Sequence, residues 1–252
     1  MSLPNPFPAG IQTAVTVTTK VTTPITKYKF KKAGTAGTLI SIVLDESGSM
    51  GKCWDATIKG FNEFVVGQKA AVATAGSSFL TLTKFDAPHI KTVYADRPIA
   101  EVPDLNKDTY RPNGGTNLLD AIGNAITQVN DTLAKRKKAD RPGVIIVITT
   151  DGEENSSTQY NNQTIKEMVA AAEKADWSFV FMGANIDSFS VGSSFGMNAS
   201  NSVNYSTSNM AGTYASLGAT TTRMRSAKMA GTSTAEIYAT AMFSEEEKKG
   251  MI

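Results

Sequence analysis

The sequence has 252 residues, of which 41% are hydrophobic, enough for one large domain with a substantial buried core. Its net charge of +2 at pH 7 gives no reason to expect general nucleic-acid affinity, and no apolar stretch has the length of a transmembrane helix. The single cysteine, Cys53, excludes an internal disulfide bond and a zinc site built from several thiolates. We therefore expect a soluble protein with no nucleic-acid or membrane partner.

Residues 1–38 differ from the rest of the chain because they contain no acidic residue. Ile, Thr and Val occupy alternate positions in residues 11–21, and Thr, Tyr and Phe alternate with lysines in residues 26–30. Both segments have the period of a β-strand. Residues 33–38 (AGTAGT) are typical of a flexible join. We expect a basic, β-prone N-terminal extension that adds to a sheet edge in a homo- or hetero-oligomer, or packs back on its own domain.

From residue 39 onward, apolar strand segments alternate with helical segments. Residues 39–44, 144–149 and 178–182 are apolar runs typical of strands buried on both faces. Further strands are predicted at 78–85, 90–94 and 203–205, and helical spacing of apolar residues predicts helices near 54–65, 118–133, 165–172 and 209–227. This alternation predicts an α/β fold over residues 39–227: a Rossmann-like, doubly wound, mostly parallel sheet with helices on both faces.

Residues 228–252 have a weaker pattern, for which we expect a loosely attached C-terminal tail. Ser244 and Glu247 have the spacing of a capping box, so the tail is predicted to hold one short helix. An unstructured end is the alternative.

Three polar loops are predicted at the carboxyl edge of the sheet, where open α/β sheets bind ligands. The first (DESGS) follows the first apolar strand and carries Asp45, Ser47 and Ser49. The second (NGGTN) precedes a helix and carries Thr116, and the third (TDGEE) follows an apolar strand and carries Asp151. Two carboxylates and three hydroxyls are hard oxygen donors that suit Mg²⁺, Mn²⁺ or Ca²⁺. For the first loop alone, a turn followed by a helix cap is the alternative.

The DESGS sequence of residues 45–49, directly after an apolar strand, resembles the D-x-S-x-S signature of von Willebrand factor type A domains. Gly-Thr at 115–116 and Thr-Asp-Gly at 150–152 resemble the other two loops of that family, in the same order. The resemblance covers roughly residues 39–227. It implies a metal-ion-dependent adhesion site in which the three hydroxyls bind the ion directly and the two aspartates often act through water.

An ion held mainly by neutral hydroxyls stays electrophilic, so a carboxylate of a partner protein would be a favourable further ligand. Our leading hypothesis is therefore a non-enzymatic, metal-dependent protein-binding module. The alternative is a structural subunit of a larger assembly, such as a virus particle, in which the N-terminal extension makes the contacts. Metal-assisted hydrolysis lacks a visible general base. Because Pro4, Pro6 and Pro8 interrupt any signal peptide, we expect a cytoplasmic or virion location.

Other reactive or charged residues have ordinary explanations. His89 is expected at the surface or at a sheet edge, without a triad partner. Cys53 is expected to pack in the core, since no base is predicted beside it. Glu153 and Glu154 are expected in a solvated loop, and the basic residues 135–138 at the solvated end of a helix.

Overall fold

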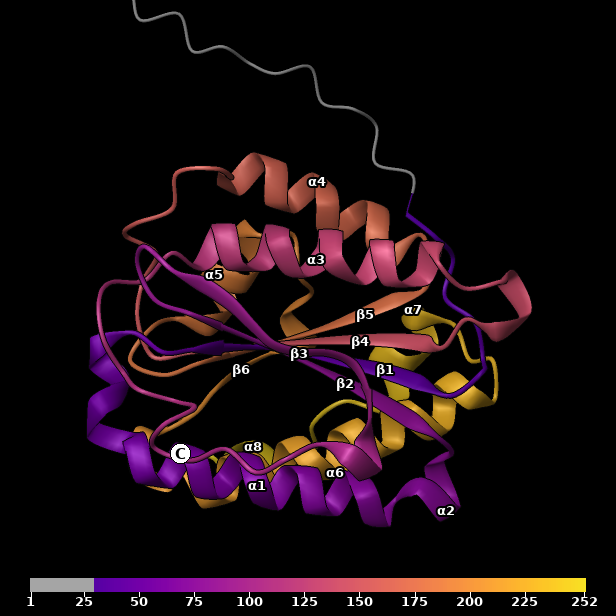
Figure 1. Cartoon of the computed structure of the whole chain (residues 1–252), viewed down its shortest axis with the longest axis horizontal. Coiled ribbons are helices and arrows are strands. Elements are labelled where there is room, and N and C mark those ends of the chain that lie inside the picture. Colours follow the sequence, from indigo (N-terminus) through magenta and orange to yellow (C-terminus); the bar gives the residue numbers. More distant parts are fainter. Residues whose placement is uncertain (1–29) are drawn as a thin grey trace, which may run out of the picture.

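Six strands form one sheet in residues 30–252, the part of the chain that the computed structural model describes (Figure 1). Their order across the sheet is β3-β2-β1-β4-β5-β6, and only the β2–β3 pair is antiparallel. The strands are β1 (Thr38–Asp45), β2 (Ser78–Phe85), β3 (Ile90–Pro98), β4 (Gly143–Thr150), β5 (Trp177–Gly183) and β6 (Ser202–Asn204). This confirms the predicted doubly wound, mostly parallel α/β sheet.

Helices cover both faces of this sheet. The α-helices are α1 (Trp54–Ala70), α2 (Val72–Ala75), α3 (Leu118–Ala134), α4 (Asn162–Glu173), α5 (Ser188–Ser194), α6 (Met210–Met229), α7 (Thr234–Thr240) and α8 (Glu245–Lys249). Short 3-10 helices are η1 (Gly48–Cys53), η2 (Ile99–Glu101), η3 (Lys138–Asp140), η4 (Ala199–Asn201) and η5 (Thr207–Asn209). Helices α3, α4 and α5 lie on one face, whereas α1, α6 and α8 lie on the other (Figure 1). Among the helices of residues 30–252, none is long and apolar enough to cross a membrane.

A separate hydrophobic core fills the space on each face of the sheet. Alternate residues of a strand point to opposite faces. In β1, Ile40, Ile42 and Leu44 belong to the core beneath α1 and α6, while Leu39 and Val43 belong to the core beneath α3 and α4. A central strand must therefore be apolar at nearly every position, which is the pattern that its sequence shows.

Most predicted elements are confirmed, but β3 is longer than predicted, and the short helices α2 and α5 were not predicted. Strand β3 continues to Pro98, beyond the predicted end at residue 94. It is an edge strand in which no residue is fully buried, so no apolar pattern marks its full length. The short helix α5 was not predicted, since it is rich in serine; the Asp187 side chain begins it by accepting the amides of Phe189 and Ser190, each at 3.1 Å.

The C-terminal tail is attached firmly and holds two helices, so the expectation of a loose tail with one helix was wrong. The predicted capping box is present, with the Ser244 side chain accepting the Glu247 amide at the start of α8. Ile237, Phe243 and Met251 are buried in the core that also contains α1 and α6. Ala241 is buried in the same core, but the i, i+4 pair of Ile237 and Ala241 spans one turn of a short helix, too little of a periodic pattern to predict this packing.

The predicted flexible join at residues 33–38 is held by backbone hydrogen bonds instead. The Ala33 amide donates to the Ala175 carbonyl at 2.9 Å, and the Gly34 amide donates to the Pro142 carbonyl at 3.0 Å. The small side chains at this point permit a close approach of two backbone segments rather than flexibility.

Most of the predicted N-terminal extension, including the segment 11–21, lies outside the described residues, so its addition to a sheet edge stays a prediction. In the described part, the ring of Phe30 packs against Trp177 with 5.3 Å between centroids. The Lys31 amide donates to the Asn130 side chain at 2.9 Å. These contacts place the first described residues on the domain's own β5 and α3.

The winding of the chain reverses between β1 and β4. After β1 the chain enters α1 on one face, and after β4 it enters α4 on the other face (Figure 1). Asp45 ends β1 and Thr150 ends β4, and the two strands are hydrogen-bonded neighbours. The loops at this edge therefore leave in opposite directions, which is the arrangement that binds ligands in open α/β sheets.

Candidate metal-binding site

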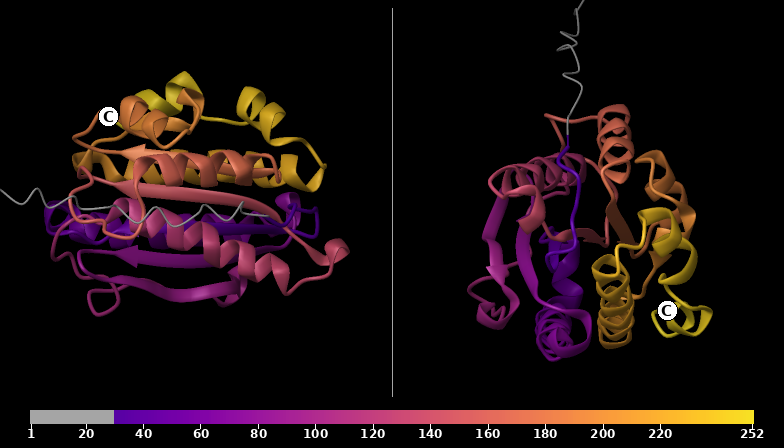
Figure 2. Two further views of the ribbon diagram at one scale, coloured as in Figure 1. Left: turned by 90° about the horizontal axis from the view of Figure 1, so that it is seen from above. Right: turned by 90° about the vertical axis from the view of Figure 1, so that its right-hand side faces the viewer.

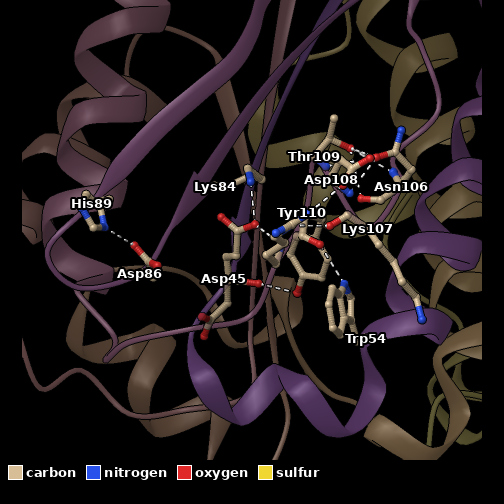
Figure 3. Close-up of polar contacts among 12 residues, drawn as sticks. Asp45, Trp54, Lys84, Asp86, His89, Asn106, Lys107, Asp108, Thr109 and Tyr110 are labelled. Carbon is tan, nitrogen blue, oxygen red and sulfur yellow. Dashed lines mark hydrogen bonds and ion pairs between the residues drawn. The ribbon is translucent and has the colours of Figure 1, made fainter.

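The Asp45 carboxylate is fully buried at the end of β1 and is held on both oxygens. Its Oδ1 accepts the Ser47 amide at 2.7 Å, and its Oδ2 accepts the Thr150 hydroxyl at 2.6 Å. Below it, the hydroxyl of the buried Tyr110 donates to the Asp45 carbonyl at 2.7 Å (Figure 3). The residue is therefore fixed in position by groups from three separate segments of the chain.

Ser47, Ser49 and Asp151 form a continuous chain of short contacts. The hydroxyl oxygens of Ser47 and Ser49 are 3.0 Å apart, and the Ser49 hydroxyl donates to Asp151 Oδ1 at 2.5 Å. Ser47 stands at the N-cap position of η1, yet its side chain makes no capping hydrogen bond. This observation disfavours a simple helix cap, since the hydroxyl of Ser47 is turned to Ser49 instead. The buried side chains of Met50 and Cys53 anchor η1 in the core.

Thr116, in the second loop, lies near Ser49 of the first loop and Gly152 of the third. A Cβ added at Gly152 would lie 3.3 Å from Thr116 Oγ1 and 3.6 Å from Ser49 Oγ, so both hydroxyls lie next to Gly152. The first and second loops are also joined directly, because the Gly48 amide donates to the Gly114 carbonyl at 3.1 Å. Gly114 has a φ of +67°, a conformation that side chains other than glycine rarely adopt. The fold thus brings all three predicted loops together.

Burial controls the ionisation of Asp45. Removal from water raises the pKa of its carboxyl to about 6, and the neighbouring Asp151 charge adds to the rise. Hydrogen bonds from Thr150 and Ser47 favour the ionised form and oppose that rise. In the absence of a cation, the ionised Asp45 carboxylate therefore lowers the stability of the folded protein at neutral pH.

The donor set fits a hard divalent cation. Asp151 Oδ2 is buried and accepts no hydrogen bond, although the Lys52 ammonium lies 3.6 Å away. A buried carboxylate oxygen without a hydrogen-bond donor is what a metal ligand leaves when no ion is present. Within residues 30–252, no group of three or more His, Cys, Asp or Glu side chains could hold a metal. The five predicted residues differ from such a group because three of their donors are hydroxyls.

A second layer of residues, not predicted as functional, supports the loops. The carboxylate of Asp120, near the start of α3, accepts the amides of Thr158, Gln159 and Tyr160 at 2.8–2.9 Å. In the opposite direction, Glu154 Oε2 accepts the Leu119 amide at 2.9 Å. The loop after Asp151 and the first turn of α3 thus hold each other in place.

Glu154 corrects one expectation. Its side chain also accepts the amides of Ser156 and Ser157 and the Ser157 hydroxyl, so it organises the loop and is not merely solvated. Glu153 is exposed, as expected. No local pattern reveals the role of Glu154, because the amide that it accepts from α3 lies 35 residues earlier in the chain.

Glu46 and Lys84 form another unpredicted contact beside the site. Lys84 Nζ lies 2.5 Å from Glu46 Oε1, and both side chains are largely buried (Figure 3). The Arg111 amide donates to the same carboxylate oxygen. Trp54 at the start of α1 donates to the Tyr110 carbonyl at 2.7 Å. These contacts tie the segment after residue 105 to the first loop and to α1.

His89 lies at the surface and Cys53 lies in the core, as expected for each. The exposed imidazole of His89 lies 3.0 Å from Asp86 and points to it rather than to Asp45 (Figure 3). Cys53 is buried, and burial raises the pKa of its thiol. Neither residue approaches the serines as a catalytic base or nucleophile in any contact of the described residues.

Comparison with known proteins gives one family and a set of distant folds. The family model of the von Willebrand factor type A domain matches residues 40–216. No curated protein sequence matches the chain. Proximal thread matrix protein 1 of the mussel byssus has a similar structure, with a TM-score of 0.53 and 12% identity over 75% of this chain and 48% of that protein. The VWA domain of SpRpn10 has a TM-score of 0.49 and 11% identity, over 70% and 95% of the two chains.

The likeness to the mussel protein concerns the fold alone, at 12% identity. This chain spans about half the length of that protein.

Proposed function

The chain belongs to the von Willebrand factor type A family, and from this premise we propose that it is a metal-dependent protein-binding module. Members of this family commonly mediate interactions between proteins. The residues that would hold the ion are those of the three loops: Asp45, Ser47, Ser49, Thr116 and Asp151. Mg²⁺, Mn²⁺ or Ca²⁺ bound there would supply a Lewis-acid centre for a carboxylate of the partner protein.

One observation carries this proposal. The Asp151 carboxylate has one oxygen bonded to Ser49 and one buried oxygen without a hydrogen-bond donor. Ser47 and Ser49 present adjacent hydroxyl oxygens beside it, and Asp45 adds a second fixed carboxylate. The protein therefore supplies the orientation: packed loops hold the oxygen donors together before any ion arrives, which limits the ordering cost of binding.

Ion binding tests the first half of the proposal. We expect wild-type protein to bind MgCl₂ and MnCl₂ in calorimetry, and Asp45→Ala to weaken that binding by about tenfold or more. Asp55→Ala is the matched control, because Asp55 is an exposed aspartate on α1. Equal ion affinity of the wild type and Asp45→Ala would contradict the proposal.

Partner binding tests the second half. The probe is an array of peptides that carry Asp or Glu, paired with the same peptides carrying Asn or Gln. We expect binding to the acidic peptides that disappears with EDTA and in Asp45→Ala. Binding that survives both treatments, but is lost when residues 1–32 are deleted, would favour the alternative of a structural subunit that assembles through its N-terminal extension.

We propose a binding role without catalysis. The imidazole of His89 pairs with Asp86, so among the described residues the Ser49 hydroxyl has a carboxylate, Asp151, as its partner and no histidine. Hydrolysis of an activated ester that is present in wild type and absent in Asp45→Ala would contradict this part.

A further inference from the structure

Lys52 places a cation of the protein itself beside the proposed ion site. Its Nζ lies 3.6 Å from Asp151 Oδ2, the carboxylate oxygen that accepts no hydrogen bond. The Asp151 side chain is completely buried, whereas the Lys52 side chain is 55% exposed. The ammonium group therefore approaches a buried negative charge from the solvent side.

The other oxygen of Asp151 is engaged as well. The Ser49 hydroxyl donates to Oδ1 at 2.5 Å, and this hydroxyl also contacts Ser47. Without an ion, the Asp151 carboxylate thus faces two groups of the protein itself, the Ser49 hydroxyl at Oδ1 and the Lys52 ammonium near Oδ2. A divalent cation close to Asp151 Oδ2 requires that Lys52 withdraws, whereas Ser49 can offer a lone pair to the ion and keep its O–H on Oδ1.

Lys52 is free to withdraw, because only its side chain has to move. Its backbone is part of η1, which Met50 and Cys53 anchor in the core. Among the ion pairs within residues 30–252, the Lys52 ammonium takes part only in the one with Asp151. Lys84 differs in this respect, since it is largely buried with Glu46 at 2.5 Å and stays in place.

We propose that Lys52 is a built-in competitor that lowers the affinity of the site for divalent cations. The inference rests on the proposed function, because it concerns the same site. Like charges repel, so an ammonium 3.6 Å from a ligand oxygen opposes a second cation on that oxygen. The side chain is half exposed and solvent screens its charge, so the effect is moderate and the ion can displace it.

Calorimetric titration of Lys52→Met with MgCl₂ and MnCl₂ tests the proposal. Methionine retains most of the aliphatic stem and removes the charge. We expect the variant to bind both ions about three- to tenfold more tightly than the wild type. Lys59→Met is the matched control: Lys59 is an exposed lysine on α1 that pairs with Glu63, so the ion affinity of this variant should stay within about twofold of wild type.

Thermal unfolding supplies a second measurement that needs no partner. In EDTA, Lys52→Met should unfold at a lower temperature than the wild type, because Asp151 loses the ammonium that faces its buried oxygen. Saturating MgCl₂ should raise the midpoint of Lys52→Met by more than it raises the midpoint of the wild type. Lys52→Gln should reproduce both results, which excludes an effect peculiar to methionine.

The outcomes separate this inference from the proposed function. Wild type that binds Mg²⁺, with Lys52→Met and Lys52→Gln binding equally or more weakly, overturns the role of Lys52 and leaves the ion site intact. If the wild type and both Lys52 variants take up neither ion, in calorimetry or in thermal unfolding, both the inference and the proposed ion site are overturned.

Discussion

At the scale of one residue, the buried charge of Asp45 lowers the stability of the folded protein. Its carboxylate is buried, and its pKa is raised from 3.8 to about 6 because burial disfavours the charge. The raised pKa means that the folded state binds a proton at Asp45 more tightly than the unfolded state does. The stabilisation from this group is complete below its unfolded pKa and is lost as the pH rises through its folded pKa.

A comparison of Asp45→Asn with wild type in EDTA measures this effect. The asparagine side chain would keep an acceptor for the Ser47 amide and would have no charge to desolvate. We expect the free energy of unfolding of the variant, minus that of the wild type, to grow by about 2 kcal/mol between about pH 4 and pH 7. Urea unfolding at a series of pH values gives this difference. Asp55→Asn, at an exposed position, should show no such trend, and a flat difference for Asp45→Asn would contradict the prediction.

At the scale of elements, the site depends on a reciprocal contact between α3 and the loop after β4. The buried Asp120 accepts three consecutive loop amides, while Glu154 in that loop accepts the Leu119 amide. Amides near the start of a helix lack partners within the helix, so an acidic side chain there stabilises it. Because Thr116 lies shortly before α3 and Asp151 begins the loop, this contact fixes the spacing of two proposed ligands.

Asp120→Ala should disrupt this contact. The substitution leaves three amides without their acceptor in a partly buried place, and we expect a loss of about 3 kcal/mol in the free energy of unfolding. Urea unfolding in EDTA measures the loss. Asp131→Ala on the exposed side of the same helix is the control and should change stability by less than about 0.5 kcal/mol. Equal stability of the two variants would show that the contact is unimportant.

At the scale of the whole molecule, the C-terminal segment closes the face of the sheet that α1 and α6 cover. Figure 2 shows this segment beside α6 on the outside of the molecule. Arg223 of α6 binds both carboxylate oxygens of Glu247, and the Met251 carbonyl accepts the Ser206 amide at 2.7 Å. The last residues of the chain are therefore part of the domain, since they complete its core.

Met251 and Ile252 test this conclusion as neighbours with opposite environments. Met251 is fully buried and Ile252 is 76% exposed. We expect Met251→Ala to lower the free energy of unfolding by about 2 kcal/mol, since it removes buried methylene and sulfur contacts. Ile252→Ala should have almost no effect. If both variants match the wild type in urea unfolding, the C-terminal segment does not contribute to the core as described.

The sequence by itself determined the class of fold and the position of the three oxygen-bearing loops. Both depend on local patterns: apolar runs mark central strands such as β1 and β4, and Asp45, Ser47 and Ser49 follow one of them directly. Their ligand roles still stay a prediction. The packed tail escaped the same reasoning, because its buried pair at helical spacing, Ile237 and Ala241, spans one turn and is too short a pattern to recognise.

Only the tertiary structure decided which groups touch within the site. Thr150 bonds to Asp45 across 105 positions of sequence, and Ser49 bonds to Asp151 across 102. The Lys52 ammonium meets the same aspartate as Ser49. Such contacts depend on the order of strands in the sheet and on the directions in which two loops leave it. Periodicity along a single segment carries no information about either, so the arrangement around Asp151 follows from the folded molecule alone.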